Sequence, residues 1–240
     1  MDDADLTEDG LLGGAVRLLQ PRRGHRAGTD AVLLAGLAAV RDGDIVADLG
    51  SASGAVGLMV AHRVPTARLL FVDRDPDLAA LCERNIGLNG FTDRAGTLTA
   101  DLFAPDSLPS AAADLVVTNP PYLDDSRDRA SPNPGRHAAH AMGDGGLAAW
   151  ISAASRILKA RGRLTMIHRA DRLPECLDAL RGRFGGLRLT FIYPRKGEAA
   201  GRVVIAGTLG SRAPLAVAPP LTLHRPGGAF TAAAERLHRG

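Results

Sequence analysis

The residues Asn119-Pro-Pro-Tyr122 are the part of the chain whose types and spacing best suit a reaction. They follow the apolar run at 115–117, which is typical of a buried strand that stops at a breaker. Two prolines fix their own φ and cannot continue a ladder of hydrogen bonds, so the backbone after Asn119 is held open. The Asn119 side-chain oxygen and the Pro120 carbonyl are acceptors, and the Tyr122 ring can stack on a ligand. The turn therefore predicts a site for a planar group that carries an NH₂.

An amine on an aromatic ring is a poor nucleophile because its lone pair is delocalised into the ring. Two acceptors that bind its two hydrogens favour a more tetrahedral nitrogen and concentrate that lone pair, which helps most in the transition state. No strong base is needed, because the proton becomes acidic once the nitrogen is alkylated. The predicted catalytic residues are Asn119, Pro120, Pro121 and Tyr122. The alternative is an ordinary Asn-Pro turn after a strand.

A glycine-containing turn, Gly50-Ser-Ala-Ser-Gly54, is expected between a strand at 45–49 and a helix at 55–64. Such a turn lets backbone N–H groups and a helix N-terminus approach a ligand, and Gly50 and Gly54 are the positions where a Cβ would obstruct it. This pattern alone suits a dinucleotide, a nucleoside or no ligand at all.

Carboxylates are expected at the ends of the next two strands. Asp73 lies 19 residues beyond Gly54, where a carboxylate accepts both hydroxyls of a ribose, in a nicotinamide dinucleotide as well as in other nucleosides. Asp101 ends the third expected strand and can accept an adenine amino group. Because Asn119 ends the fourth, polar groups follow four successive strands, and a hydride-transfer enzyme needs no amine-binding turn at the fourth. The alternative for both aspartates is a helix cap or a surface acid.

With these motifs the sequence resembles the amino methyltransferases that use S-adenosylmethionine and carry an Asn/Asp-Pro-Pro-Tyr/Phe motif. The resemblance implies S-adenosylmethionine as the cofactor and no metal, with the methyl group presented toward Asn119. It implies eight cofactor-binding residues: Asp48, Gly50, Ser51, Gly54, Asp73, Arg74, Asp101 and Leu102. Ala52 stands where the family's D-x-G-x-G-x-G motif usually has its middle glycine.

From about residue 10 to 231 the chain is similar to bacterial tRNA adenine-N6 methyltransferases that modify the base next to the anticodon of a valine tRNA. The residues that carry the similarity are Leu11-Leu-Gly-Gly14, Leu19-Gln-Pro-Arg-Arg-Gly-His-Arg26, Asp30-Ala-Val-Leu-Leu-Ala35, Asn119-Pro-Pro-Tyr122, His168-Arg-Ala-Asp-Arg-Leu-Pro174 and Pro219-Pro-Leu-Thr-Leu-His224. The implied reaction is methylation of the exocyclic N6 amine of an adenine in tRNA.

Contacts to RNA phosphates are expected from basic residues in loops near the predicted turn. The candidates are Arg22, Arg23, Arg26, Arg127, Arg129, Arg136 and His137. The net charge is +3, and five acidic residues among the first nine positions conceal a more basic remainder. Of the 29 lysines and arginines 27 are arginine, which a compositional bias of the genome explains as well as RNA binding does.

Two rival functions stay open at this stage. A protein glutamine N5-methyltransferase acting on release factors also has a planar amide acceptor, but such enzymes generally carry a helical domain before the first strand, and only 44 residues precede Ile45 here. A non-catalytic RNA-binding member of the fold is the second rival, which only Ala52 favours.

The composition is that of an ordinary soluble globular protein, with 45% hydrophobic and 23% charged residues in 240. No apolar run reaches the roughly 18–20 residues of a membrane span, and the acidic start lacks the basic region of a signal peptide, so a cytoplasmic location is expected. Cys82 and Cys176 show no disulfide or zinc spacing and are expected to be core thiols. Whether the protein is a monomer or a homodimer stays open.

The elements that position these residues alternate between strand and helix, which predicts an α/β fold. The resemblance implies a Rossmann-like, seven-stranded methyltransferase sheet with helices on both faces, its last strand antiparallel. Strands are expected at 15–20, 45–49, 68–72, 95–100, 115–117, 162–168, 187–193 and 202–208, and helices at 31–40, 55–64, 75–89, 147–159 and 173–183, with one short helix within 102–113. We expect a flexible acidic N-terminus at 1–9 and a single methyltransferase domain at 10–240. That domain comprises an extension at 15–44, the core sheet at 45–209, and a C-terminal arm at 210–240 that hairpins over the sheet.

Overall fold

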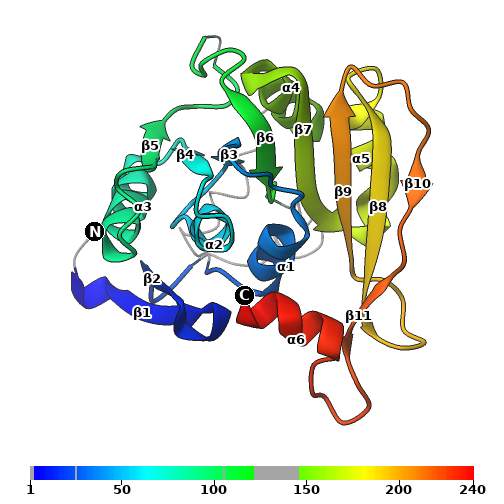
Figure 1. The fold of residues 1–240 in the computed structure, drawn as a ribbon, viewed down its shortest axis with the longest axis horizontal. Helices are drawn as coiled ribbons and strands as arrows, with labels where there is room; N and C mark the ends of the chain where they lie inside the picture. The colour runs from blue at the N-terminus through cyan, green and yellow to red at the C-terminus, as the bar shows by residue number, and fades with distance from the viewer. Residues whose placement is uncertain (1–2, 25, 105, 122–145) are drawn as a thin grey trace, which may run out of the picture.

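The fold is described by a computed structural model for residues 3–24, 26–104, 106–121 and 146–240. A nine-stranded sheet runs through the molecule, and a separate two-stranded hairpin lies beside it (Figure 1). The order of strands in the sheet is β10-β8-β9-β7-β6-β3-β4-β5, and β11 also pairs with β8.

Four parallel strands form the half of the sheet that precedes the predicted catalytic turn. They are β3 (Ile45–Leu49), β4 (Arg68–Asp73), β5 (Ala95–Thr99) and β6 (Ala113–Thr118). Apart from Asp48, Asp114 and Thr118, β3 and β6 are apolar and mostly buried, as expected for parallel strands covered on both faces.

The other half of the sheet contains the antiparallel strand. β9 (Arg202–Leu209) pairs antiparallel with both β7 (Leu158–Arg169) and β8 (Phe184–Arg195). The predicted seven-stranded sheet with an antiparallel last strand is therefore confirmed, and two short strands of the C-terminal arm extend it at the β8 edge. These strands, β10 (Ala216–Val217) and β11 (Leu221–His224), run parallel to β8.

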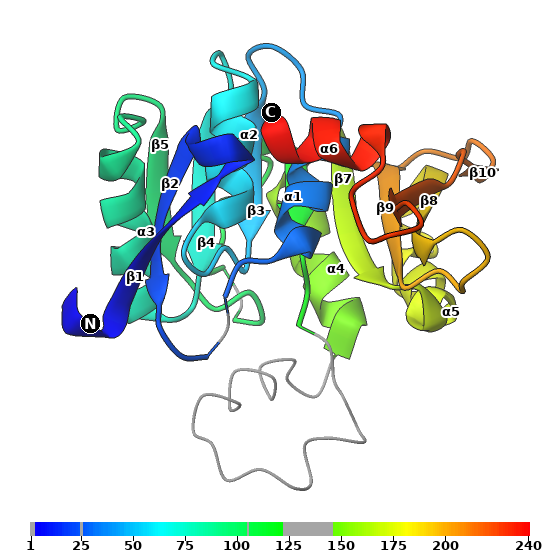
Figure 2. The same cartoon turned by 90° about the horizontal axis from the view of Figure 1, so that it is seen from below.

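Helices cover both faces and divide the apolar residues into two cores. On one face lie α1 (Thr29–Leu37), α2 (Ala55–Arg63) and α3 (Pro76–Leu88). On the other lie α4 (Gly146–Ile157) and α5 (Leu173–Leu180). Figure 2 shows that β6 ends and α4 begins on one side of the molecule, and that the segment between β2 and α1 lies on this side as well. The end of β6, where the predicted catalytic turn begins, and the basic segment after β2 therefore lie on the same side of the molecule.

The N-terminal residues differ from the sequence prediction. Leu6–Leu11 form β1, which pairs antiparallel over its whole length with β2 (Val16–Pro21). The prediction of a flexible tail at 1–9 is wrong for the strand residues. The composition of β1 is acidic, but its backbone pairs along its whole length with β2. β2 itself was predicted correctly.

Two further segments differ from the sequence prediction. The C-terminal arm first lengthens the sheet edge and then turns back through an antiparallel bridge between His224 and Phe230. It ends in α6 (Ala232–Arg239), whose Leu237 packs against Gly36 of α1. No helix forms among the described residues of 102–113. α1 begins without a side-chain cap, and Asp30 in its first turn forms an ion pair with Arg202 at 2.9 Å.

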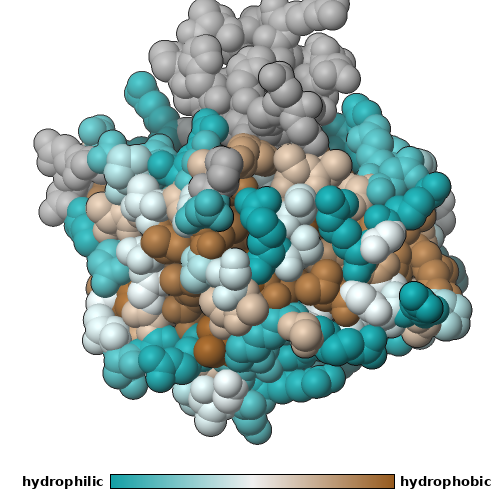
Figure 3. All heavy atoms as spheres, turned by 90° about the horizontal axis from the view of Figure 1, so that it is seen from above, coloured by the Kyte–Doolittle hydropathy of each residue, from teal (hydrophilic) through white to brown (hydrophobic). Residues whose placement is uncertain are grey.

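Cys82 and Cys176 are free and buried, as predicted. None of the helices within the described ranges combines the length and the apolar composition that crossing a bilayer requires. On the face drawn in Figure 3, hydrophobic and hydrophilic residues are mixed rather than separated into one large apolar area.

Candidate active site

The ends of four neighbouring strands bring the predicted polar residues to one edge of the sheet. Thr118 pairs with Leu49, so Asn119 follows β6 at the level where Gly50 follows β3. Leu49 also pairs with Val72, which places Asp73 at the same level of β4. Carboxyl ends of parallel strands at such an edge are the usual ligand position of open α/β sheets.

Every second residue of the glycine turn, from Gly50 to Gly54, has a left-handed backbone conformation. Gly50, Ala52 and Gly54 all have positive φ, at 71°, 47° and 89°. Each is a glycine position of the motif in the implied family, and the turn geometry explains why. Ala52 adopts a left-handed conformation that costs a residue with a Cβ roughly 1–2 kcal/mol.

The two glycines are also required by the packing around the turn. A Cβ on Gly50 would lie 2.8 Å from the Trp150 ring, and one on Gly54 would lie 2.6 Å from the sulfur of Cys82. The backbone N–H groups of Gly50 and Ser51 both donate to the carbonyl of Val72, at 2.8 and 3.1 Å. Packing of Trp150 and Cys82 therefore requires glycine at both positions, in addition to the positive φ. That the missing Cβ atoms also admit a ligand stays a prediction.

Asp73 holds the same turn from the neighbouring strand. One carboxylate oxygen accepts the N–H of Ala52 at 2.8 Å, and the other accepts the N–H of Asp75 at 3.0 Å. Each oxygen retains a second lone pair. The residue is half-buried, so it can still accept hydroxyl groups of a ligand beside the turn.

Asp48 is buried and faces α2 instead of the open edge. It accepts the N–H of Gly57 at 2.9 Å, one of the first-turn donors that a helix cannot satisfy internally. Burial raises the pKa of Asp48 to about 7, and the charge of Asp73 contributes in the same direction, while the Gly57 hydrogen bond opposes the shift. Its observed role is to anchor the start of α2 behind the glycine turn.

Ser51 provides the clearest sign of a missing polar partner. Its hydroxyl oxygen is buried and makes no hydrogen bond to any described residue. Leaving such a group unsatisfied costs about 1–3 kcal/mol. A polar ligand group at this turn would relieve that cost.

The remaining cofactor candidates lie on the adjoining loops. Asp101 is exposed and accepts the N–H of Phe103 at 2.9 Å. The side chain of Leu102 is buried, and its carbonyl accepts a hydrogen bond from Arg156 at 2.9 Å. Arg74 is exposed directly after Asp73.

At the catalytic turn, Asn119 is half-buried, Pro120 is buried and Pro121 is half-buried. Tyr122 lies outside the described residues, as do four substrate-binding candidates: Arg127, Arg129, Arg136 and His137.

Sequence reasoning missed Trp150 of α4. Its indole N–H donates to the hydroxyl of Thr118 at 2.9 Å, and its ring lies against Gly50. Trp150 is the only tryptophan in the chain, and the amphipathic pattern of its helix could have placed it on the buried face. Its contacts with two separate loops could not be read from the sequence.

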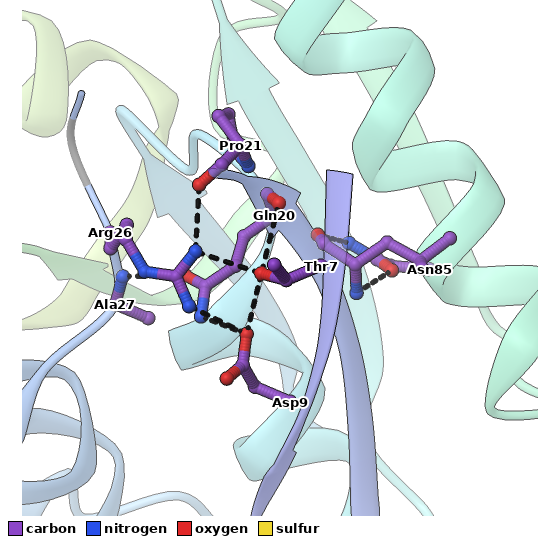
Figure 4. A network of polar contacts seen from close by, with 8 residues as sticks. Thr7, Asp9, Gln20, Pro21, Arg26, Ala27 and Asn85 are labelled. Carbon is purple, nitrogen blue, oxygen red and sulfur yellow. Dashed lines mark hydrogen bonds and ion pairs between the residues drawn. The ribbon is translucent and has the colours of Figure 1, made fainter. Parts of the chain in front are cut away.

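The basic segment after β2 is held in place by hydrogen bonds of Arg26 and Gln20 (Figure 4). Arg26 donates to the carbonyl of Pro21 and the hydroxyl of Thr7, both at 2.8 Å, and pairs with Asp9 at 2.7 Å. Gln20 makes a second connection. Its side-chain oxygen accepts the N–H of Ala27 at 2.9 Å, and its side-chain NH₂ donates to Asp9 at 2.9 Å.

The predicted phosphate contacts therefore divide into two kinds. The side chain of Arg26 is engaged within the protein, so its expected role in binding phosphate is not supported by its position. Arg22 and Arg23 are exposed, and the Arg22 side chain donates to the carbonyl of Ala4 at 2.9 Å.

The hairpin is also fastened to the glycine turn. The side chain of Asn85, fully buried in α3, pairs with both the N–H and the carbonyl of Leu19 at 2.8 Å. It donates in addition to the carbonyl of Ser53 at 2.9 Å. One side chain thus connects β2 to the turn that follows β3, a link the sequence did not reveal.

Comparisons with known proteins agree with this architecture. The family model described as the methyltransferase small domain matches residues 27–191. Two proteins named tRNA1(Val) (adenine(37)-N6)-methyltransferase, from Porphyromonas gingivalis and Phocaeicola vulgatus, are 32% and 31% identical to this chain. The matches cover 62% and 75% of this chain, and 61% and 76% of those proteins. The chain thus spans about three fifths of the length of the Porphyromonas relative.

Solved structures share the fold. A protein of Agrobacterium tumefaciens described as a predicted O-methyltransferase is 33% identical, with a TM-score of 0.74 covering 88% of this chain and 97% of that chain. The 16S rRNA N2 G1207 methyltransferase of T. thermophilus, in complex with AdoMet and guanosine, has a TM-score of 0.59 at 18% identity, covering 85% of this chain and 50% of that chain.

The strand order, the antiparallel β9 and the polar strand ends define a Rossmann-like methyltransferase fold. Within that class, the chain belongs to the methyltransferase small domain family.

Proposed function

We propose that this protein is an S-adenosylmethionine-dependent N-methyltransferase that acts on the exocyclic N6 amine of an adenine in tRNA, at a position next to the anticodon. The observation that carries the proposal is the placement of Asn119-Pro120-Pro121 after β6, one strand away from the Gly50 turn and two from Asp73. An amine-accepting turn thereby lies beside carboxylates suited to a nucleoside. The names of the Porphyromonas and Phocaeicola relatives support the same substrate.

The residues at the sheet edge fit the cofactor. The unpartnered hydroxyl of Ser51 calls for a polar ligand group at the turn. Asp73 would accept the ribose hydroxyls through its remaining lone pairs, and Asp101 and Leu102 would flank the adenine on the next loop. Asp48 supports the turn through α2, without reaching the ligand itself.

When bound, S-adenosylmethionine supplies an electrophilic methyl group on a sulfonium. Asn119 and the Pro120 carbonyl accept the two N–H hydrogens of the adenine amine and turn its lone pair toward that methyl. The Gly50 turn and Asp73 would hold S-adenosylmethionine, while Asn119 and the Pro120 carbonyl would hold the amine that accepts its methyl group. The amine then releases one proton to solvent, so no residue has to act as a strong base.

The remaining predicted contacts concern the RNA. Tyr122 would stack on the adenine, and Arg22 and Arg23 would contact phosphates from the basic segment after β2 on the same side of the molecule. Arg127, Arg129, Arg136 and His137 stay candidates for the same role. A tRNA substrate accords with a cytoplasmic location.

The test is transfer of a labelled methyl group from S-adenosylmethionine to total tRNA and, separately, to a release factor, followed by nucleoside or peptide analysis. We expect N6-methyladenosine in tRNA. Methylglutamine in the release factor would replace this proposal with the protein methyltransferase function. A 2′-O-methyl nucleoside would support the O-methyl chemistry named for the Agrobacterium protein. Absence of cofactor binding by calorimetry would support a non-catalytic member of the fold.

A further inference from the structure

Trp150 is buried where three loops of the candidate site meet. Only 6% of its surface is exposed. It lies on α4, which covers the face of the sheet opposite to α2, and α4 itself contributes none of the predicted site residues. Its contacts therefore join loops that come from other elements.

The first link is a chain of two hydrogen bonds between the ends of β6 and β3. The indole N–H of Trp150 donates to the Thr118 hydroxyl at 2.9 Å, and that hydroxyl donates to the Leu49 carbonyl at 2.8 Å. A hydroxyl has one hydrogen, so the bond from Trp150 fixes it in the role of donor to Leu49. Both Thr118 and Trp150 are buried, where such a chain is stronger than in water.

The position of these bonds gives them their significance. Thr118 directly precedes Asn119, and Leu49 directly precedes Gly50. The bonds thus join the last residue before the amine-accepting turn to the last residue before the cofactor turn. They add side-chain hydrogen bonds to the backbone pairing of Leu49 with Thr118 at the point where both turns begin.

The indole ring makes two more contacts at the same edge. Its six-membered ring lies against Gly50, where a Cβ would approach it to 2.8 Å. Its edge-to-face contact with Phe103 has a centroid separation of 6.2 Å and an interplanar angle of 65°. Phe103 follows Leu102 and donates its N–H to Asp101, so the third loop is held as well.

We propose that Trp150 and Thr118 form a positioning pair that sets the spacing between the Asn119 turn and the cofactor turn. The inference rests on the proposed function and adds to it the residues on which transfer geometry depends. Methyl transfer requires the reacting atoms to approach within about 3–3.5 Å in line, and a displacement of about 1 Å costs roughly 10²-fold in rate. Neither side chain is a catalytic residue, because each acts through its neighbour.

The test uses variants that separate the hydrogen bonds from packing. Trp150→Phe removes the indole N–H and keeps an aromatic ring. Thr118→Val removes the hydroxyl and keeps the shape, whereas Thr118→Ser keeps the hydroxyl and serves as the matched control. For each, we would measure the single-turnover methyl-transfer rate with saturating tRNA and cofactor, the cofactor Kd by calorimetry, and the melting temperature.

We expect Trp150→Phe and Thr118→Val each to lower the transfer rate about 10-fold while the cofactor Kd changes less than about 3-fold. The transfer rate of the double variant should be lower than that of wild type by no more than about 10–20-fold, because both changes break the same chain of bonds. Thr118→Ser should stay within about 2-fold of wild type. Multiplicative rate losses, or equal losses in Thr118→Ser and Thr118→Val, would overturn the proposal.

A binding measurement that needs no RNA tests the positioning pair independently of which molecule accepts the methyl group. Because Trp150 is the only tryptophan and its ring touches Gly50, its fluorescence should change when S-adenosylhomocysteine binds. Thr118→Val should diminish that change at saturation, and Thr118→Ser should preserve it. If wild type methylates no RNA but shows this fluorescence pattern, the acceptor is wrong and the positioning pair stands. If neither variant differs from wild type, the positioning pair is wrong whatever the acceptor.

Discussion

The carboxylate of Asp73 accepts the backbone N–H of Ala52 at 2.8 Å, and Ala52 has a φ of 47°. Asp73 therefore holds an alanine in a conformation that glycine adopts freely. The same carboxylate is the predicted partner of the cofactor ribose. The contact makes the shape of the glycine turn depend on the residue that would bind the ligand.

Replacing Ala52 by glycine should stabilise the protein. The change removes the roughly 1–2 kcal/mol that the left-handed conformation costs alanine. Glycine also raises the conformational entropy of the unfolded chain, which offsets part of this, so the net gain in the free energy of unfolding is about 0.5–1 kcal/mol. We expect the melting temperature to rise by about 1–4 °C, measured by calorimetry. Ala80, exposed within α3, is the control: Ala80→Gly should lower the melting temperature. A drop in both variants would contradict the assigned conformation of Ala52.

Asp48 should make the stability of the ligand-free protein depend on pH. Its pKa is raised to about 7 in the folded protein, whereas it is about 3.9 in an unfolded chain. Between these values the folded state holds a proton that the unfolded state has lost. The contribution of Asp48 to the free energy of unfolding is therefore fully present below about pH 4 and is lost toward pH 7, by up to about 1.4 kcal/mol per pH unit.

The variant Asp48→Asn isolates this effect, because asparagine can still accept the N–H of Gly57 and does not titrate. Denaturant unfolding of both proteins from pH 4.5 to 8 should show the variant gaining stability relative to wild type as the pH rises. Parallel curves for the two proteins would mean that Asp48 is ionised in the folded protein at every pH tested.

Asn119→Ala should lower turnover by about 10²-fold or more and leave the cofactor Kd nearly unchanged. The reason is that its amide oxygen is proposed to act on the amine in the transition state, not on the cofactor. Single-turnover kinetics and calorimetry would be measured on the same preparation. Equal losses in rate and cofactor affinity would indicate a structural role at the end of β6.

Exposed and engaged arginines should respond differently to salt. Arg22→Gln and Arg23→Gln should each reduce the slope of log K against log salt for tRNA binding by about 0.7–0.9, the value for one lost phosphate contact. Arg26→Gln should keep the wild-type slope and lower the melting temperature, because it removes the contacts to Asp9, Thr7 and Pro21. A slope change for Arg26→Gln as large as for Arg23→Gln would return Arg26 to the phosphate contacts.

Much of the sheet could be predicted because its signals are local. β3, β4 and β6 are short apolar runs that end at a polar residue, a glycine or a proline, and α3 carries Asp75 as its cap and Pro76 in its first turn. β1 was missed because an acidic composition conceals a strand whose ladder comes entirely from β2. α6 was missed because it follows a segment rich in proline and glycine, and it packs on an element nearly 200 residues earlier.

The amino-acid sequence by itself determined the alternation of strands and helices and the polar residues at the strand ends, since backbone propensity, side-chain period and proline geometry act between near neighbours. Only the tertiary structure decided what those residues touch. Gly50 lies against Trp150, Arg26 pairs with Asp9, and Asn85 joins Leu19 to Ser53. Each partner lies far enough along the chain that packing of the whole sheet had to bring it within reach.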